Sequence, residues 1–326
     1  MKRLVWLSIV IVIVAALWTG AWLWGSSQIG AVQQQLAAAD GVSSPKVTCG
    51  TFGVSGFPFG FDISCINATV IYGDTTVTVA GVKAQAEVYN PFFVLVSAKS
   101  PASFADAFSG SQSRLDFSDA NASLRLNPWR IARISVVVDQ PALTDTVVED
   151  QPIAKATHLE AHLIDEPDKH DAKAGLASLA QYAEVDGLSV PTNSPATTIG
   201  NGKVTLEGEV TNLSDDARTY GDPDLLKRWQ AAGGSFTLKS LHGVDGDRSF
   251  DVTGEAKLDA SGRLDGRVKL QSKGVIEVIG PSIPDAYRGI LTGSPAADGS
   301  YSQTISIAAG LVFVGLVPVG SLPPLY

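Results

Sequence analysis

Alternating apolar and polar residues mark three neighbouring stretches of the chain: Phe236-Thr-Leu-Lys-Ser-Leu241, Phe250-Asp-Val-Thr-Gly-Glu-Ala-Lys-Leu258 and Leu264-Asp-Gly-Arg-Val-Lys-Leu270. A period of two puts every second side chain on the same face of a β-strand. Residues 243–247 and 259–262, which separate the stretches, contain the glycine and aspartate typical of hairpin turns. Because strands joined by short turns pair antiparallel, this part of the chain predicts an antiparallel meander.

The same alternation continues towards the N-terminus. It marks residues 75–79, 82–89, 134–139 and 203–210. Few segments favour helices: residues 223–229 indicate a short helix that ends at Gly233-Gly234, and residues 103–108 and 284–291 are further candidates. We therefore expect a mainly β body, an antiparallel and curved sheet with a few short helices.

An uncharged apolar run, residues 4–24, directly follows Lys2 and Arg3. At a rise of 1.5 Å per residue, a helix of this length is about 31 Å long and matches the hydrocarbon core of a bilayer. The two cations before the run orient the N-terminus towards the cytoplasm. Tryptophans crowd the distal end, as in an interfacial aromatic belt: Trp18, Trp22 and Trp24.

A cleaved signal peptide is the alternative interpretation of this run. Such a peptide needs a shorter apolar core and small residues before the cut, whereas Leu23-Trp24 are bulky. We therefore expect a retained signal anchor over residues 4–24, with residues 1–3 in the cytoplasm. The anchor would make the chain a single-pass protein of the inner (cytoplasmic) membrane, with the bulk of the chain in the periplasm.

The composition limits the class of protein and its partners. Hydrophobic residues make up 45% and charged residues 17%, with 32 glycines, which excludes a disordered chain, a collagen and a coiled coil. The 24 basic and 33 acidic residues give a net charge of −9, which argues against nucleic acid. Beyond the anchor the balance is 22 basic to 33 acidic, so anionic headgroups would repel this part. The membrane is expected as a partner only through the anchor.

Composition shifts define the domain organisation. Residues 25–45 are expected to form a stalk that contains a short helix and ends near Gly41 and Pro45. Residues 46–326 are expected to form the extracytoplasmic β-rich domain. The proline-containing loop near residues 190–196 leaves open a sub-division of this domain.

The chain has two cysteines, Cys49 and Cys65, and the midpoint between them is Phe57. If a hairpin closes there, the two residues lie directly opposite each other. An exported compartment is oxidising, so we expect a structural disulfide; a redox-active pair would normally have C-x-x-C spacing. The turn Gly56-Phe-Pro-Phe-Gly60 places two aromatic rings at the hairpin end. We interpret these rings as a core plug under the hairpin, in preference to a ligand contact.

These residues also resemble a known family. Its N-terminal signature is similar to Cys49, the turn Ser55-Gly-Phe-Pro-Phe59, Phe61 and Cys65. Its later recurrent pieces resemble Trp229-Gln-Ala-Ala-Gly-Gly234, the spaced residues Gly254, Leu258 and Gly262, and Val317-Pro-Val-Gly-Ser-Leu-Pro-Pro-Leu325. The chain thus resembles, over nearly its whole length, the membrane-anchored bacterial "domain of unknown function 2125" family, which occurs mainly in alphaproteobacteria.

The resemblance implies a location and an architecture, without an activity. A looser similarity links the strand-rich body to AsmA-like and YdgA-like envelope proteins. Where the family often has a basic residue after the turn, this chain has Gly60, so no anion-binding role is carried over.

One local cluster could carry chemistry: His158, Glu160 and His162 share a face if they lie on a strand. Two imidazoles and a carboxylate are zinc ligands, but positions i and i+4 of a strand are about 13 Å apart. The preferred interpretation is the solvated face of a strand whose inner face carries Leu159, Ala161 and Leu163. The sequence predicts no catalytic residue, no bound metal and no cofactor, and it does not identify a ligand-binding site.

Two function classes follow. The first is a non-catalytic envelope module that acts as a scaffold, with an envelope protein as its partner, or binds an apolar ligand such as lipid. The alternative is a periplasmic, metal-dependent enzyme based on the His158 cluster. The alternation does not distinguish an open apolar groove from a closed core, since both need one apolar face per strand. The inward residues in either arrangement are Val77, Val79, Val136, Val138, Leu206 and Val210.

Overall fold

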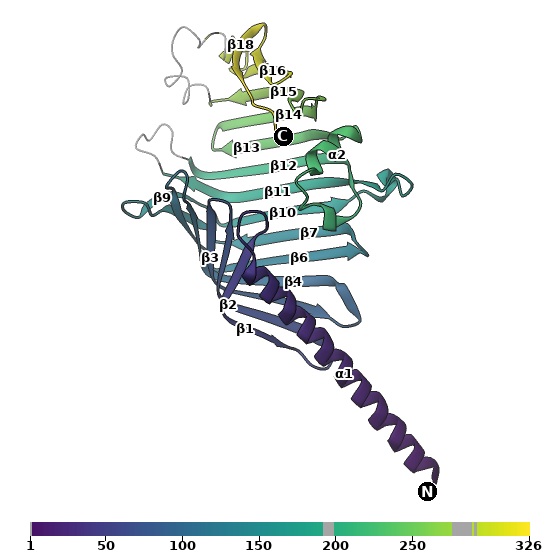
Figure 1. Cartoon of the computed structure of the whole chain (residues 1–326). Coiled ribbons are helices and arrows are strands. Elements are labelled where there is room, and N and C mark those ends of the chain that lie inside the picture. The colour runs from purple at the N-terminus through teal and green to yellow at the C-terminus, as the bar shows by residue number, and fades with distance from the viewer. Residues whose placement is uncertain (1, 192–198, 276–288, 290–291) are drawn as a thin grey trace. The chain divides into compact units, whose positions relative to one another are not determined.

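The computed structural model describes residues 2–191, 199–275, 289 and 292–326. It divides the chain into two compact units, which we call unit 1 (Met1–Ser123 and Leu143–Gln151) and unit 2 (Leu124–Ala142 and Pro152–Tyr326) (Figure 1). The mainly β fold with a long apolar N-terminal helix and an antiparallel sheet is confirmed.

Unit 1 combines one long helix with a meander of antiparallel strands. Strand β1 pairs with β2, β2 with β3, β3 with β4 and β4 with β5. The elements are α1 (Lys2–Ala38), β1 (Lys46–Ser55), β2 (Gly60–Tyr72), β3 (Thr75–Glu87), β4 (Asn90–Asp106) and β5 (Gln112–Asp116). Three further strands cross the division between the units along the chain: β6 (Asp119–Asn127), β8 (Ala142–Asp145) and β9 (Gln151–Lys155).

The expected anchor and stalk helix form one continuous helix, α1. Its portion Val5–Ala38 is long and apolar enough to cross a membrane, which fits a single-pass anchor. The helix continues past the end of the apolar run at Trp24, because the residues after Gly25 tolerate helical backbone. The N-terminal part of α1 extends beyond the strands, whereas its C-terminal part lies against β1 (Figure 1).

A line of irregular backbone crosses the strands of unit 1 near their middle. Asn67 adopts a positive φ of 52°, and the β1–β2 ladder is interrupted where Gly50 lies opposite it. The β3–β4 register shifts between Val79 and Gly81. Across this line the apolar positions of each strand switch between even and odd residue numbers. In β2 they change from Val70 to Ile63, and in β3 from Val79 to Val82.

Unit 2 is a longer antiparallel meander. Strand β7 pairs with β10, after which β10 to β18 pair in chain order (Figure 1). The strands are β7 (Arg130–Asp139), β10 (His158–Asp165), β11 (Leu176–Val190), β12 (Ile199–Ser214), β13 (Ser235–Asp245), β14 (Arg248–Leu258), β15 (Leu264–Lys273), β16 (Tyr301–Ala308), β17 (Leu311–Val314) and β18 (Val317–Ser321). The short helices are η1 (Pro167–Lys169), η2 (Ala217–Thr219) and α2 (Leu225–Ala231).

Three local predictions have different outcomes. Helix α2 lies within the segment predicted to be helical and ends before Gly233, whose φ of 69° suits glycine. The helix expected over residues 103–108 is wrong, because most of that segment belongs to β4, where neighbouring strands supply its hydrogen bonds. The candidate helix 284–291, apart from residue 289, and most of the loop near 190–196 lie outside the described residues. The strands that flank this loop, β11 and β12, both belong to unit 2.

Full burial is rare in the described part of the chain. Seven hydrophobic residues are buried there: Ala68, Ala102, Ile131, Ala177, Leu179, Leu258 and Val314. Most other strand residues are half-buried. A sheet whose apolar residues stay half-buried has not enclosed them in a packed core of the usual kind.

Candidate functional site

One face of the unit 2 sheet is apolar over successive strands. Residues directly opposite each other in a register share a face, so the pairings trace rows across the sheet. The central row joins residues of β7 and of β10 to β15: Val136, Ala161, Ala183, Leu206, Leu241, Val252 and Leu270. Parallel to it run Val138, Leu159, Val185 and Val204. We call this surface the apolar face.

The apolar face is accessible at the positions predicted to point inward. Val136, the first residue of the central row, is 36% exposed, whereas a closed core would bury it. The other predicted inward residues, in both units, are half-buried: Val77, Val79, Val138, Leu206 and Val210. The structure therefore brings the unit 2 members onto one face without burying any of them.

A cavity of about 190 Å³ opens at one end of the apolar face. Its walls are mainly apolar, with Leu188, Val204 and Phe250 among them. Gly243 makes room for the Phe250 ring, because a Cβ at Gly243 would lie 2.2 Å from Phe250 Cε1. An ion pair between Arg248 and Asp245 lines the same cavity. No residue pattern predicted this cavity, since its lining residues come together only when β11 to β14 pair.

A buried ion pair joins β7 and β10 further along these two strands than the positions that the rows cross. Arg130 Nη2 is 3.0 Å from Asp165 Oδ2, and the Asp165 side chain is only 6% exposed. Neither Arg130 Nε nor Asp165 Oδ1 has a hydrogen-bond partner in the described part of the chain. Burial raises the pKa of the nearby Tyr220 to about 12, and the charges of Asp215 and Asp165 add to the rise.

The predicted cluster His158, Glu160 and His162 lies on the opposite, polar face of β10. Glu160 Oε2 is 3.7 Å from His158 Nε2 and 3.4 Å from His162 Nε2. Alternation therefore brought the three side chains together, and the two rings lean towards Glu160 despite the span of the strand. His158 Nδ1 also lies 2.7 Å from Asp139 Oδ1 on β7, which raises the pKa of His158.

Strands β11 and β12 extend this polar cluster. The Tyr182 hydroxyl donates to Glu184 at 2.6 Å, and Lys203 Nζ donates to the other oxygen of Glu184 at 2.6 Å. The hydrogen bond to Glu184 raises the pKa of Tyr182 to about 12, while the hydrogen bond from Lys203 lowers the pKa of Glu184. Tyr182 also stacks beside His162, with ring centroids 6.1 Å apart. Asp139, Glu184 and Lys203 each have a hydrogen-bond partner, the arrangement of a solvated strand face.

Metal-ligand geometry does not emerge from these contacts. Among residues 2–191, 199–275, 289 and 292–326, no group of three or more histidine, cysteine, aspartate or glutamate side chains could hold a metal ion. In the same cluster, His158 Nδ1 and the Glu184 carboxylate already contact Asp139, Tyr182 and Lys203.

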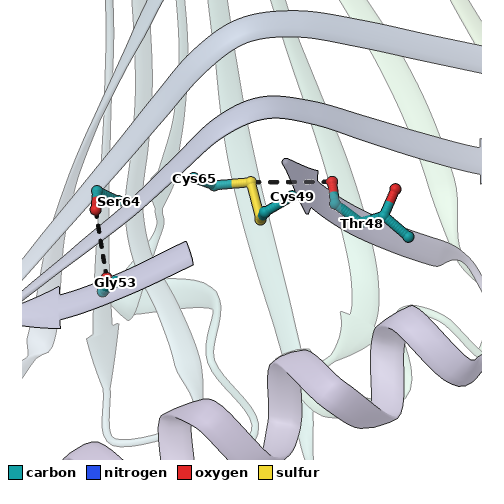
Figure 2. The surroundings of a disulfide bond; sticks show 5 residues. All are labelled: Thr48, Cys49, Gly53, Ser64 and Cys65. Atoms are coloured by element: carbon teal, nitrogen blue, oxygen red, sulfur yellow. Dashed lines mark hydrogen bonds between the residues drawn. A yellow bond between two sulfur atoms is a disulfide. The ribbon is translucent and has the colours of Figure 1, made fainter. Parts of the chain in front are cut away.

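The disulfide between Cys49 and Cys65 is confirmed, with Cα atoms 5.2 Å apart (Figure 2). The expectation that the two residues lie directly opposite each other is wrong. The register pairs Cys49 with Ala68 and Cys65 with Phe52. The strand therefore has to bend between Cys65 and Ala68, and the left-handed conformation of Asn67 provides that bend.

The aromatic turn after β1 has a different place from the one predicted. The core-plug interpretation is wrong, because Phe57 is 52% and Phe59 is 67% exposed. Trp18 and Trp22 of α1 instead contact this turn. The sequence predicts both tryptophans at the membrane interface, and it does not predict their contact with the turn.

Comparison with known proteins identifies the family. No curated protein and no solved structure matches the chain. The similarity to AsmA-like and YdgA-like envelope proteins therefore stays a prediction. Residues 22–323 match the family described as "Uncharacterized protein conserved in bacteria (DUF2125)". This match covers nearly the whole chain, including both units and the disulfide, and the chain belongs to this bacterial family.

Proposed function

We propose that the protein is a membrane-anchored, non-catalytic module whose unit 2 sheet binds the acyl chains of lipids on its apolar face. The observation that carries this proposal is the row of apolar residues from Val136 to Leu270, which crosses seven paired strands without a charged residue. Apolar patches larger than a few hundred Å² are uncommon on soluble surfaces unless they bind something.

The choice of lipid over another apolar ligand rests on the anchor. Helix α1 fits a single membrane pass, so the chain carries its apolar face at a bilayer. Lys2 and Arg3 before the apolar run favour a cytoplasmic N-terminus, and a disulfide favours an oxidising compartment for the rest. In a bacterium these features together support the inner membrane and the periplasm.

The test compares substitutions on the two faces of one strand. Val136→Asp puts a carboxylate on the apolar face, and the position is exposed enough to accept it. Ser135→Asp puts the same group on the polar face, where Arg133 Nε already donates to Ser135 Oγ at 2.9 Å. Both variants keep the anchor, so lipid that surrounds α1 is the same in each.

Phospholipid bound per protein is measured after mild detergent extraction and native mass spectrometry. We expect Val136→Asp to lower the bound lipid several-fold and Ser135→Asp to leave it at the level of the unchanged chain. Val138→Asp, one position along the apolar side of β7, repeats the test in case the first variant fails to fold. Equal lipid content in all variants that fold would contradict lipid binding and favour a scaffold.

A further inference from the structure

The turn between β1 and β2 is fixed against the membrane-spanning part of α1. The Trp18 indole N–H donates to the carbonyl of Pro58 at 2.9 Å, and the Trp22 indole N–H donates to the carbonyl of Gly60 at 2.8 Å. The Trp22 ring stacks on Phe61 with centroids 5.6 Å apart and meets Phe57 edge-on at 5.5 Å. These contacts hold the turn at the level of residues 18–22 of the helix.

That level lies inside the apolar run and not above it. Trp18 precedes Trp24, the last residue of the run, by six positions, which is about 9 Å along a helix. The run as a whole is about as long as a bilayer core is thick. If residues 4–24 span the hydrocarbon, the turn lies below the surface of the leaflet on the side of the β domain.

The exposed side chains of the turn match such a depth. Both rings of the turn are largely accessible: Phe59 is 67% and Phe57 is 52% exposed. Between the turn and the helix lies a wedge of about 580 Å³ with mainly apolar walls, bounded by Val14 and Trp18 on α1 and by Pro58 on the turn. Exposure of this apolar surface to water is unfavourable, whereas an acyl chain that covers it would remove it from water.

Several backbone groups of the turn have partners within the protein, which suits hydrocarbon because hydrocarbon cannot satisfy polar groups. Pro58 has no N–H, and the carbonyls of Pro58 and Gly60 accept the two indole N–H groups. The Gly56 carbonyl accepts the Gly60 N–H at 2.9 Å, and the Phe59 carbonyl accepts the Val88 N–H at 2.9 Å. Four carbonyls of an exposed turn thus have partners that do not depend on water.

We propose that the Phe57-Pro58-Phe59 turn inserts into the leaflet on the side of the β domain, with the two rings among the acyl chains. The turn would act as a second contact with the membrane and would fix the rotation of unit 1 about α1. This proposal rests on the proposed anchoring of α1, and it does not depend on lipid binding by the apolar face of unit 2.

The test uses the full chain in vesicles of phosphatidylethanolamine and phosphatidylglycerol. The photo-reactive residue p-benzoylphenylalanine replaces Phe59 in one variant and Phe57 in a second, and it forms covalent adducts with neighbouring C–H groups on irradiation. The control position is Phe108, which is 89% exposed and also belongs to unit 1. It lies at the opposite end of the strands, where Ala107 N–H donates to Asp74 and Gly73 N–H donates to Gly41 just past α1.

Mass spectrometry of the irradiated protein detects the adducts, and flotation of the vesicles checks the anchor. We expect lipid adducts at the positions of Phe59 and Phe57, at least tenfold above those at Phe108. Protein that floats with the vesicles but gives no lipid adduct at either turn position overturns the insertion and leaves the anchor intact. Equal adducts at all three positions also overturn it, and protein that does not float overturns both the anchor and the insertion.

Discussion

Unit 1 joins its strands with a disulfide, whereas unit 2 contains no cysteine and joins its strands with ion pairs. In unit 1, Arg114 pairs with Asp116 and Asp150 at the surface. In unit 2, Arg130 pairs with the buried Asp165, and Glu209, only 10% exposed, accepts from Lys169 at 2.5 Å and from Lys239 at 3.1 Å.

The difference follows from the small number of buried side chains in the described part of both units. An antiparallel sheet with few buried side chains gains little hydrophobic stabilisation per residue, so other interactions have to fix its register. Unit 1 bends at Asn67, and the disulfide closes a short loop across that bend. Unit 2 keeps one face apolar and accessible, so its pairing is reinforced by cross-strand charges, most of them on the polar face.

The largest expected effect tests the dependence of unit 2 on charge. Arg130→Met leaves the buried Asp165 carboxylate without its cation, and removing one partner of a buried pair costs about 3–5 kcal/mol. The free energy of unfolding from denaturant titration, with hydrogen exchange to locate the change, measures the loss. Arg130→Met combined with Asp165→Leu should recover most of it, because no charge is then buried. A loss of hydrogen-exchange protection confined to unit 1 would contradict the dependence of unit 2 on this ion pair.

The next effect tests the dependence of unit 1 on its covalent link. Replacing both Cys49 and Cys65 by alanine opens a loop whose ends are 16 residues apart, which costs about 3 kcal/mol on the chain-entropy estimate. Hydrogen exchange should rise in β1 and β2 and stay unchanged in β10 to β15. An unchanged free energy of unfolding, with the thiols shown to be oxidised in the original chain, would contradict a stabilising role.

The smallest effect sharpens the comparison on the polar face of unit 2. The hydrogen bond to Asp139 raises the pKa of His158 above its ordinary value of 6.5, and the charge of Glu160 adds a smaller rise. The pair therefore contributes fully below about pH 6.5, and its contribution is lost as the pH rises through the raised pKa. Because the His158 side chain is 36% exposed, solvent screens the pair and the change is about a few tenths of a kcal/mol.

Melting temperature between pH 5.5 and 8.5 measures this dependence. Asp139→Asn should flatten the profile of melting temperature against pH, because it removes the main acceptor of His158. The control variant Asp251→Asn removes the corresponding acceptor of His242, which lies 2.7 Å away on β14. A profile that is the same in the Asp139→Asn variant as in the unchanged chain would show that the His158 pair contributes nothing measurable.

Local pattern was enough to predict much of the secondary structure, although it placed a helix at residues 103–108, where most of the segment belongs to β4. Alternation at 236–270 predicted β13 to β15, and the uncharged run at 4–24 predicted the first part of α1, because both are periodicities of neighbouring residues. The pairing of Cys49 with Cys65 was also within reach, since a short loop in an oxidising compartment allows few alternatives. The grouping of His158, Glu160 and His162 followed from the same alternation.

Tertiary structure alone decided how these elements are used. Because the strand bends at Asn67, the two cysteines of the disulfide are not the directly opposite pair that was expected. No local residue pattern predicts a left-handed asparagine within a strand. The contact of the Phe57-Pro58-Phe59 turn with Trp18 joins residues 40 positions apart. Whether Val136 is covered depends on the layer that faces it, and alternation is identical for an open and a closed sheet because each strand needs only one apolar face.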